Sequence, residues 1–165
     1  MKIVTGGQTG VDRAALDVAV GFGMSYGEWC PRGGWAEDFP EPPGIRAKFP
    51  LLTETPLADP AQRTAWNIRD SDVVLILVAD AGISISAGTA LARQLAESQG
   101  KPTLVIDLSE ADAAASAREW LEAQRARFGA GLRLGIGGPR ESEAPGMYER
   151  ARAFLSALFR TQGTD

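Results

Sequence analysis

The sequence contains no histidine and only one cysteine, Cys30. Without histidine there is no imidazole to act as a general base near neutral pH, and the usual histidine-containing zinc and haem sites are excluded. One thiol cannot form a disulfide within the chain, and we expect Cys30 to be a packed apolar side chain. Any chemistry must therefore come from carboxylates, arginines, hydroxyl groups or that thiol, and we expect no metal ion bound directly by the protein.

The 165-residue chain also lacks an excess of positive charge and any long apolar run. Its formal net charge is -4 at pH 7, whereas a protein that binds nucleic acid nonspecifically needs a basic face to neutralise phosphates. No run approaches the ~20 apolar residues that cross a membrane, and the first 20 residues do not resemble a signal peptide. We therefore expect a cytoplasmic protein whose partners include neither nucleic acid nor a membrane.

Short apolar runs alternate with segments of helical periodicity along most of the chain. We expect strands over residues 2–5, 72–78, 103–107 and 132–136, and helices over residues 9–20, 87–99, 111–127 and 147–159. Continuous apolar strands separated by helices are typical of a parallel sheet with right-handed crossovers. The sequence thus predicts an α/β protein, a single Rossmann-like domain with a doubly wound parallel sheet over residues 1–160, followed by a flexible tail at 161–165.

Residues 30–56 interrupt this alternation. They hold most of the ten prolines, and we interpret them as an extended loop, which is longer than a compact domain usually tolerates without a functional use. Trp29, Trp35 and Trp66 lie around this segment. Their rings are suited either to stacking on a planar ligand or to anchoring the loop.

Three glycine-containing turns follow predicted strands: the first turn (6–10), the second turn (84–89) and the third turn (137–142). Because the strand-to-helix connections of a parallel sheet emerge at one edge, we expect the three turns to meet there. Glycine lets the backbone approach a ligand closely, and the next helix presents a partial positive charge to an anion. None of the turns has a Walker A lysine or the pattern G-x-G-x-x-G, which disfavours nucleoside triphosphate hydrolysis and nicotinamide chemistry.

Polar side chains in and beside these turns complete a candidate anion site. Three hydroxyl groups add hydrogen-bond donors, and three arginines are either charge partners of the anion or ion-pair partners of neighbouring carboxylates. Asp12 falls in the first turn of a predicted helix, where a carboxylate is favourable by roughly 0.3 to 1 kcal/mol whatever its function. The candidate binding residues are Gly6, Gly7, Gln8, Thr9, Gly10, Asp12, Arg13, Arg63, Ser86, Gly88, Thr89 and Arg140.

Several runs of the sequence together resemble the molybdenum-cofactor carrier proteins. The most specific are GGQTGVDRAALD (6–17) and GPRESEAPG (138–146); the others are WCPRGGWAEDFP (29–40), RTAWNIRDSD (63–72), SAGTALA (86–92) and GKPTLVIDL (100–108). The resemblance covers nearly the whole chain in order. It implies a Rossmann-like fold, assembly into homo-oligomers (dimers or tetramers), and a pocket for the anionic molybdenum cofactor, whose metal ligands come mainly from its own pterin. Enzymes that accept this cofactor would be the protein partners.

The wider superfamily of these carriers includes the lysine-decarboxylase-like, cytokinin-activating phosphoribohydrolases. Those enzymes have a pattern resembling P-G-G-x-G-T-x-x-E, in which the glutamate is needed to cleave the ribosyl bond. Alignment on Gly88 and Thr89 places Ala92 at the glutamate position, and we therefore expect no catalytic residue. Two alternatives stay open: a nucleotide-processing hydrolase that uses Glu37, Asp38 or Asp70 instead, and a module that senses nucleotide derivatives.

Overall fold

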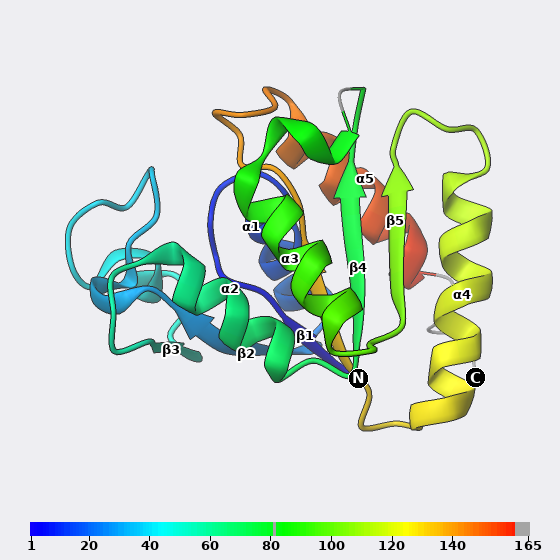
Figure 1. Cartoon of the computed structure of the whole chain (residues 1–165), viewed down its shortest axis with the longest axis horizontal. Coiled ribbons are helices and arrows are strands. Elements are labelled where there is room, and N and C mark those ends of the chain that lie inside the picture. Colours follow the sequence, from blue (N-terminus) through cyan, green and yellow to red (C-terminus); the bar gives the residue numbers. More distant parts are fainter. Residues whose placement is uncertain (81, 161–165) are drawn as a thin grey trace.

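The computed structural model describes residues 1–80 and 82–160, and these form a six-stranded parallel sheet flanked by helices (Figure 1). The strands are β1 (Lys2–Val4), β2 (Ser25–Cys30), β3 (Leu52–Glu54), β4 (Val73–Val78), β5 (Thr103–Asp107) and β6 (Arg133–Gly137). The helices are α1 (Val11–Gly21), α2 (Pro60–Arg69), α3 (Ala87–Ser98), α4 (Ala113–Phe128) and α5 (Met147–Arg160). The predicted α/β class and doubly wound, Rossmann-like parallel sheet are confirmed. The tail expected at 161–165 lies outside the described residues.

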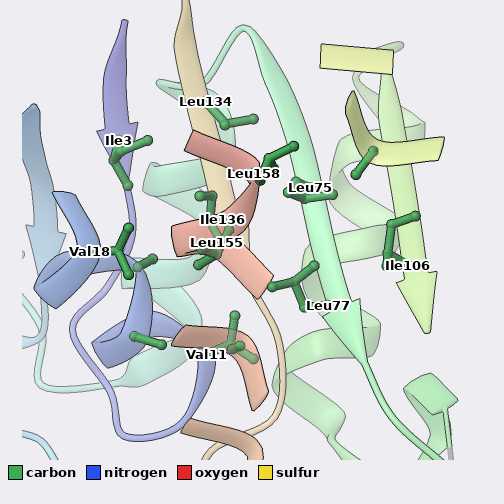
Figure 2. Packing of buried hydrophobic residues seen from close by; sticks show 14 of the residues in the cluster. Ile3, Val11, Val18, Leu75, Leu77, Ile106, Leu134, Ile136, Leu155 and Leu158 are labelled. Atoms are coloured by element: carbon green, nitrogen blue, oxygen red, sulfur yellow. The ribbon is translucent and has the colours of Figure 1, made fainter. Parts of the chain in front are cut away.

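Helices cover both faces of the sheet. Helices α1, α4 and α5 pack on one face, where Ile3, Leu75 and Leu134 belong to the largest apolar cluster (Figure 2). Helices α2 and α3 pack on the other face, where Ile68 and Ala96 meet β4. All six residues of β4 are buried, as its unbroken apolar run requires.

Strand β6, the last strand in the sequence, lies between β1 and β4 because the strand order is β3-β2-β1-β6-β4-β5. After β1 the chain enters α1 on one face, whereas after β4 it enters α3 on the other face (Figure 1). Where connections diverge to opposite faces, a crevice opens at the carboxyl edge of the sheet. The first, second and third turns all leave the sheet around this point.

The expectation of an extended loop over residues 30–56 is wrong. The segment includes β3 and two short 3-10 helices, η1 (Arg32–Gly34) and η2 (Gly44–Ala47). It also buries Ile45, Phe49 and Leu52 in a second apolar cluster, together with Leu16 of α1. The segment is thus held by its own small core, which offsets the entropy of ordering a proline-rich chain.

Cys30 lies in this second cluster and is fully buried. Burial raises the pKa of its thiol to about 11, so the thiol stays protonated near neutral pH. The side chain therefore acts as a packed apolar group, which is the role expected from the sequence.

Candidate functional site

A cleft opens at the carboxyl edge of the sheet, between strands β1, β6 and β4 and helices α2 and α3. The empty space between its lining residues is about 650 Å³, which includes open solvent at its mouth. Eight of the twelve candidate residues line it: Gly6, Gln8, Asp12, Arg63, Ser86, Gly88, Thr89 and Arg140. The cleft therefore brings together candidates from all three turns.

The remaining four candidates lie outside the lining of the cleft: Gly7, Thr9, Gly10 and Arg13. Gly10 has φ of 74°, and a Cβ atom there would lie 2.3 Å from the carbonyl oxygen of Pro139, so only glycine lets the first turn pack on the third. The hydroxyl of Thr9 donates to the Glu37 carboxylate and accepts from the N–H of Glu141 at 3.1 Å. These contacts hold the turns in place.

Arg13 and Arg140, two of the expected charge partners of an anion, are paired with carboxylates. Arg13 donates to both oxygens of Asp38 at 2.7 and 2.9 Å, and this hydrogen bonding lowers the pKa of Asp38 below its ordinary value. The Nε of Arg140 lies 3.2 Å from Oε1 of Glu143. Both arginines follow the ion-pair interpretation, and of the two only Arg140 borders the cleft.

Arg63 and Asp12 form a buried ion pair in the wall of the cleft. Nη1 of Arg63 lies 2.8 Å from Oδ2 of Asp12, and the two side chains are 11% and 10% exposed. The guanidinium extends across Gly6, where any Cβ atom would overlap it. Among the described residues the buried Nε of Arg63 has no acceptor, so the pair leaves one N–H group that these residues do not satisfy.

Two threonine hydroxyls at the cleft also lack partners. Thr5 follows β1 and is 2% exposed, and Thr89 lies in the first turn of α3 and is 3% exposed. Within the described part of the chain neither Oγ1 atom makes a hydrogen bond. Because buried hydroxyls are normally paired, these two atoms are candidates for binding a ligand.

The start of α3 is open toward the cleft. Ser86 is the N-cap, and its Oγ accepts a hydrogen bond of 3.2 Å from the N–H of Thr89. A Cβ atom on Gly88 would approach no atom closer than Ser86 Oγ, at 3.9 Å. Glycine in a helix costs about 1 kcal/mol relative to alanine, and neither packing nor backbone conformation requires it here. Its effect is to leave space beside the first turn of α3.

Helix α2 supplies a wall of the cleft that the sequence reasoning missed, apart from Arg63. Asn67, one helical turn beyond Arg63, exchanges two hydrogen bonds of 2.9 Å with the backbone of Trp29. The hydroxyl of Ser71 donates to the carbonyl oxygen of Asn67 at 2.7 Å. The spacing of Arg63 and Asn67 in RTAWNIRDSD was the available signal, because residues four apart share a helix face.

The three tryptophans near residues 30–56 do not line the cleft, and two of them, Trp29 and Trp66, anchor α2 to β2. The rings of Trp29 and Trp66 pack edge to face with centroids 4.6 Å apart. The indole N–H of Trp29 donates to Asp70 at 2.6 Å. Trp35 borders a separate shallow hollow with neighbouring prolines.

The three carboxylates that the hydrolase alternative would need, Glu37, Asp38 and Asp70, also lie outside the lining of the cleft. Glu37 instead joins the first and third turns, since it accepts from Thr9 and, at 2.7 Å, from the hydroxyl of Ser142. Burial raises the pKa of Glu37, but the hydrogen bonds from Ser142 and Thr9 outweigh it and lower the pKa below its ordinary value.

Two further features are absent from residues 1–80 and 82–160. None of the helices there combines the length and apolar character needed to span a bilayer. The same residues contain no group of three or more cysteine, aspartate or glutamate side chains arranged to hold a metal ion.

The parallel sheet with helices on both faces, and the cleft at its switch point, define a Rossmann-like α/β class of protein. Within this class, the model of the circularly permutated YpsA SLOG family matches residues 3–159. The chain belongs to that family.

A solved structure of a relative agrees with this assignment. The chain is similar to a protein from Syntrophus aciditrophicus SB named Putative molybdenum carrier protein, with 37% identity and a TM-score of 0.82 over 95% of this chain and 93% of that one. No curated protein matches the sequence. The family resemblance drawn from the sequence motifs is confirmed.

Proposed function

We propose that this protein binds a small phosphate-bearing molecule in the cleft and holds it without changing it chemically. The leading candidate is the molybdenum cofactor, because the sequence resembles carriers of that cofactor and the similar protein from Syntrophus aciditrophicus is named for carrying molybdenum. One observation supports the proposal most directly: the buried hydroxyl of Thr89, which has no hydrogen-bond partner among the described residues, lies at the start of α3 beside the open space at Gly88.

The start of α3 has the physical properties of a phosphate site. The first N–H groups of a helix carry a combined partial charge of roughly +0.5, and a phosphate can accept hydrogen bonds from them. The hydroxyl of Thr89 adds a donor that is already buried. Because Gly88 has no side chain, phosphate oxygens can come close to this turn, with Ser86 fixing its geometry.

Arg63 and Arg140 also line the proposed site. Arg63 is fixed by Asp12 and keeps an unsatisfied Nε, which suits it to orient a ligand oxygen. Gly6 and Gln8 line the same wall. In the cofactor the metal is cargo bound by the pterin, so its retention by the protein depends on these donors and not on protein ligands to the metal.

The lining of the cleft favours binding over hydrolysis. Ala92 borders the cleft at the position aligned with the glutamate of the phosphoribohydrolases. The carboxylates that do line it, Asp12 and Glu143, are each engaged by an arginine.

Gly88→Ala is the sharpest test of this proposal. We expect protein purified anaerobically from a molybdenum-supplied host to carry pterin and molybdenum in equal amounts, and the variant to carry at least about tenfold less, because the methyl group blocks close approach to α3. Pterin fluorescence and elemental analysis measure both. Gly21→Ala in α1 is the matched control, since no described atom lies within 4 Å of a Cβ atom at that position.

The variant should fold at least as well as the wild type, because alanine is the better helix former. Equal cofactor loading of the wild type and Gly88→Ala would contradict the proposed site. The absence of pterin from all three proteins would contradict the proposed ligand. Steady release of base from nucleoside monophosphates would show hydrolysis in place of storage.

The assembly and the recipient are part of the same proposal. We expect homo-oligomers, dimers or tetramers, that deliver the ligand to enzymes using the molybdenum cofactor. This expectation comes from the family resemblance, and sedimentation measures the assembly directly.

A further inference from the structure

The carboxylate of Asp12 has one oxygen that is held and one that is not. Oδ2 accepts from Nη1 of Arg63 at 2.8 Å and from the N–H of Gln8 at 3.3 Å. Both donors bond to the same oxygen, and no described residue donates a hydrogen bond to Oδ1. The side chain is 7% exposed and lines the cleft. The carboxylate is thus fixed in orientation while it keeps an accepting oxygen.

The free oxygen faces an open space above the last residue of β6. A Cβ atom on Gly137 would have a single neighbour within 4 Å, Oδ1 of Asp12 at 3.9 Å. Gly137 does not have the positive φ that would require glycine, and it too lines the cleft. A pocket the size of one small group therefore lies between the backbone of Gly137 and Asp12.

A carboxylate oxygen accepts hydrogen bonds and cannot donate them. It therefore repels phosphate oxygens and attracts an N–H or O–H group. Arg63 cancels the net charge of Asp12, so the carboxylate can lie in the same cleft as an anion without excluding it. The cleft thereby presents donors to one part of a ligand at α3 and an acceptor to another part at Asp12.

We infer that Asp12 is the specificity-determining residue of the cleft, and that it accepts a hydrogen bond from a donor group on the non-phosphate part of the ligand, above Gly137. This inference rests on the proposed function. The donor is either a sugar hydroxyl or a ring N–H, and a phosphate-bearing ligand without such a group loses this interaction. A site built to hydrogen-bond a donor discriminates strongly against analogues that lack it.

Gly137→Ala tests the inference without breaking the ion pair of Asp12. The methyl group makes only an ordinary 3.9 Å contact in the folded chain, but it occupies the space through which a ligand reaches Oδ1. The probes are inorganic phosphate, ribose 5-phosphate and guanosine 5′-monophosphate, measured by calorimetry or by competition. Gly131→Ala is the control, since nothing lies within 4 Å of Gly131 and it does not line the cleft.

We expect the wild type to bind at least one of the two organic phosphates about tenfold or more tightly than inorganic phosphate. Gly137→Ala should remove that preference and leave binding of inorganic phosphate unchanged. If ribose 5-phosphate already shows the preference, the donor is a sugar hydroxyl; if only guanosine 5′-monophosphate shows it, the donor is a ring N–H. Asp12→Asn is a second variant, which should lose the same preference. Thermal unfolding of this variant measures how much stability is lost when Arg63 loses its ion pair.

The failure of the inference differs from the failure of the proposed function. If Gly137→Ala keeps the preference while Gly88→Ala weakens all three probes, Asp12 plays no part in recognition but the phosphate site stands. Equal wild-type affinity for all three probes also overturns the inference. If no probe binds the wild type, the proposed function fails and the inference fails with it.

Discussion

At the scale of single residues, the glycines around the cleft are of two kinds. At Gly10 and Gly138 the space of a side chain is filled by atoms of the protein itself. At Gly88 and Gly137 that space is open and belongs to the cleft. The first kind serves packing and the second leaves room for a ligand, so the two kinds should respond in opposite ways to substitution by alanine.

Gly138→Ala should destabilise the protein. Its Cβ atom would lie 2.3 Å from the carbonyl oxygen of Leu77 and 2.6 Å from Cγ2 of Val11, and backbone atoms cannot move aside as a flexible side chain can. We expect the free energy of unfolding in urea to fall by about 2 to 4 kcal/mol. Gly131→Ala, at an open position, is expected to change it by less than about 0.5 kcal/mol. Equal stability of the two variants would contradict the packing role of Gly138.

The sequence alone does not separate these two kinds of glycine. The turns were found because glycine and small polar residues follow apolar strands, which is a local pattern. What fills the space above each glycine depends on residues far away in the sequence, such as Leu77 for Gly138. For the same reason the pairing of Arg63 with Asp12, 51 residues apart, was one of two open interpretations.

At the scale of elements, strong hydrophobic periodicity was sufficient to predict a strand or helix, and weak periodicity was not. Strand 103–107 and the start of the helix at residue 87 were predicted as they are in the structure. Helix α2 was missed although Asp59 caps it, accepting from Ala61 at 2.9 Å, and Pro60 begins it. Those start signals followed a proline-rich segment and preceded a polar sequence, so they carried little weight. The wall of the cleft that α2 builds was missed with it.

Asp70 at the end of α2 predicts a loss of stability in acid. Hydrogen bonds from Arg69, opposed by burial and assisted by the indole N–H of Trp29, lower its pKa from 3.8 to about 2. A lowered native pKa adds stability that is present above pH 3.8 and lost as the pH falls through 2. We expect a loss of about 1 to 2 kcal/mol from this group between pH 4 and pH 2, since Arg69 is half exposed and screened by solvent.

Urea unfolding at a series of pH values measures this loss. Asp70→Asn should be less stable than the wild type at pH 5 and should show a shallower decline toward pH 2. Parallel declines in the two proteins would contradict the role of Asp70 in joining α2 to β2.

At the scale of the whole molecule, charge is balanced locally in the cleft. The chain has a net charge of -4, but the ion pairs Arg63–Asp12 and Arg140–Glu143 cancel within the lining. Binding that depends on buried donors and a helix terminus is less sensitive to salt than binding to an unpaired cluster of arginines.

We therefore expect the dissociation constant of a phosphate-bearing probe to change by less than about threefold between 20 and 300 mM salt. Calorimetry or fluorescence titration at a series of salt concentrations measures it. A tenfold weakening would indicate that the arginines release their carboxylates and bind the anion by charge. The control is a titration with a sugar that carries no phosphate, which measures any signal that salt produces without binding of the anion.

Other expectations at this scale stay predictions. They are a domain boundary at residue 160, a flexible tail over 161–165, homo-oligomeric assembly and a cytoplasmic location. Each comes from composition or family resemblance, and none follows from how the described residues pack.

The position of β6 in the middle of the sheet has a consequence for biosynthesis. Strand β1 pairs with β2 on one side and with β6 on the other, and β6 also joins β1 to β4. A nascent chain that has emerged from the ribosome only as far as α4 holds two half-sheets with no strand between them. The proposed ligand can therefore bind only after translation has passed the third turn, and ribosome-bound chains truncated before β6 should remain empty.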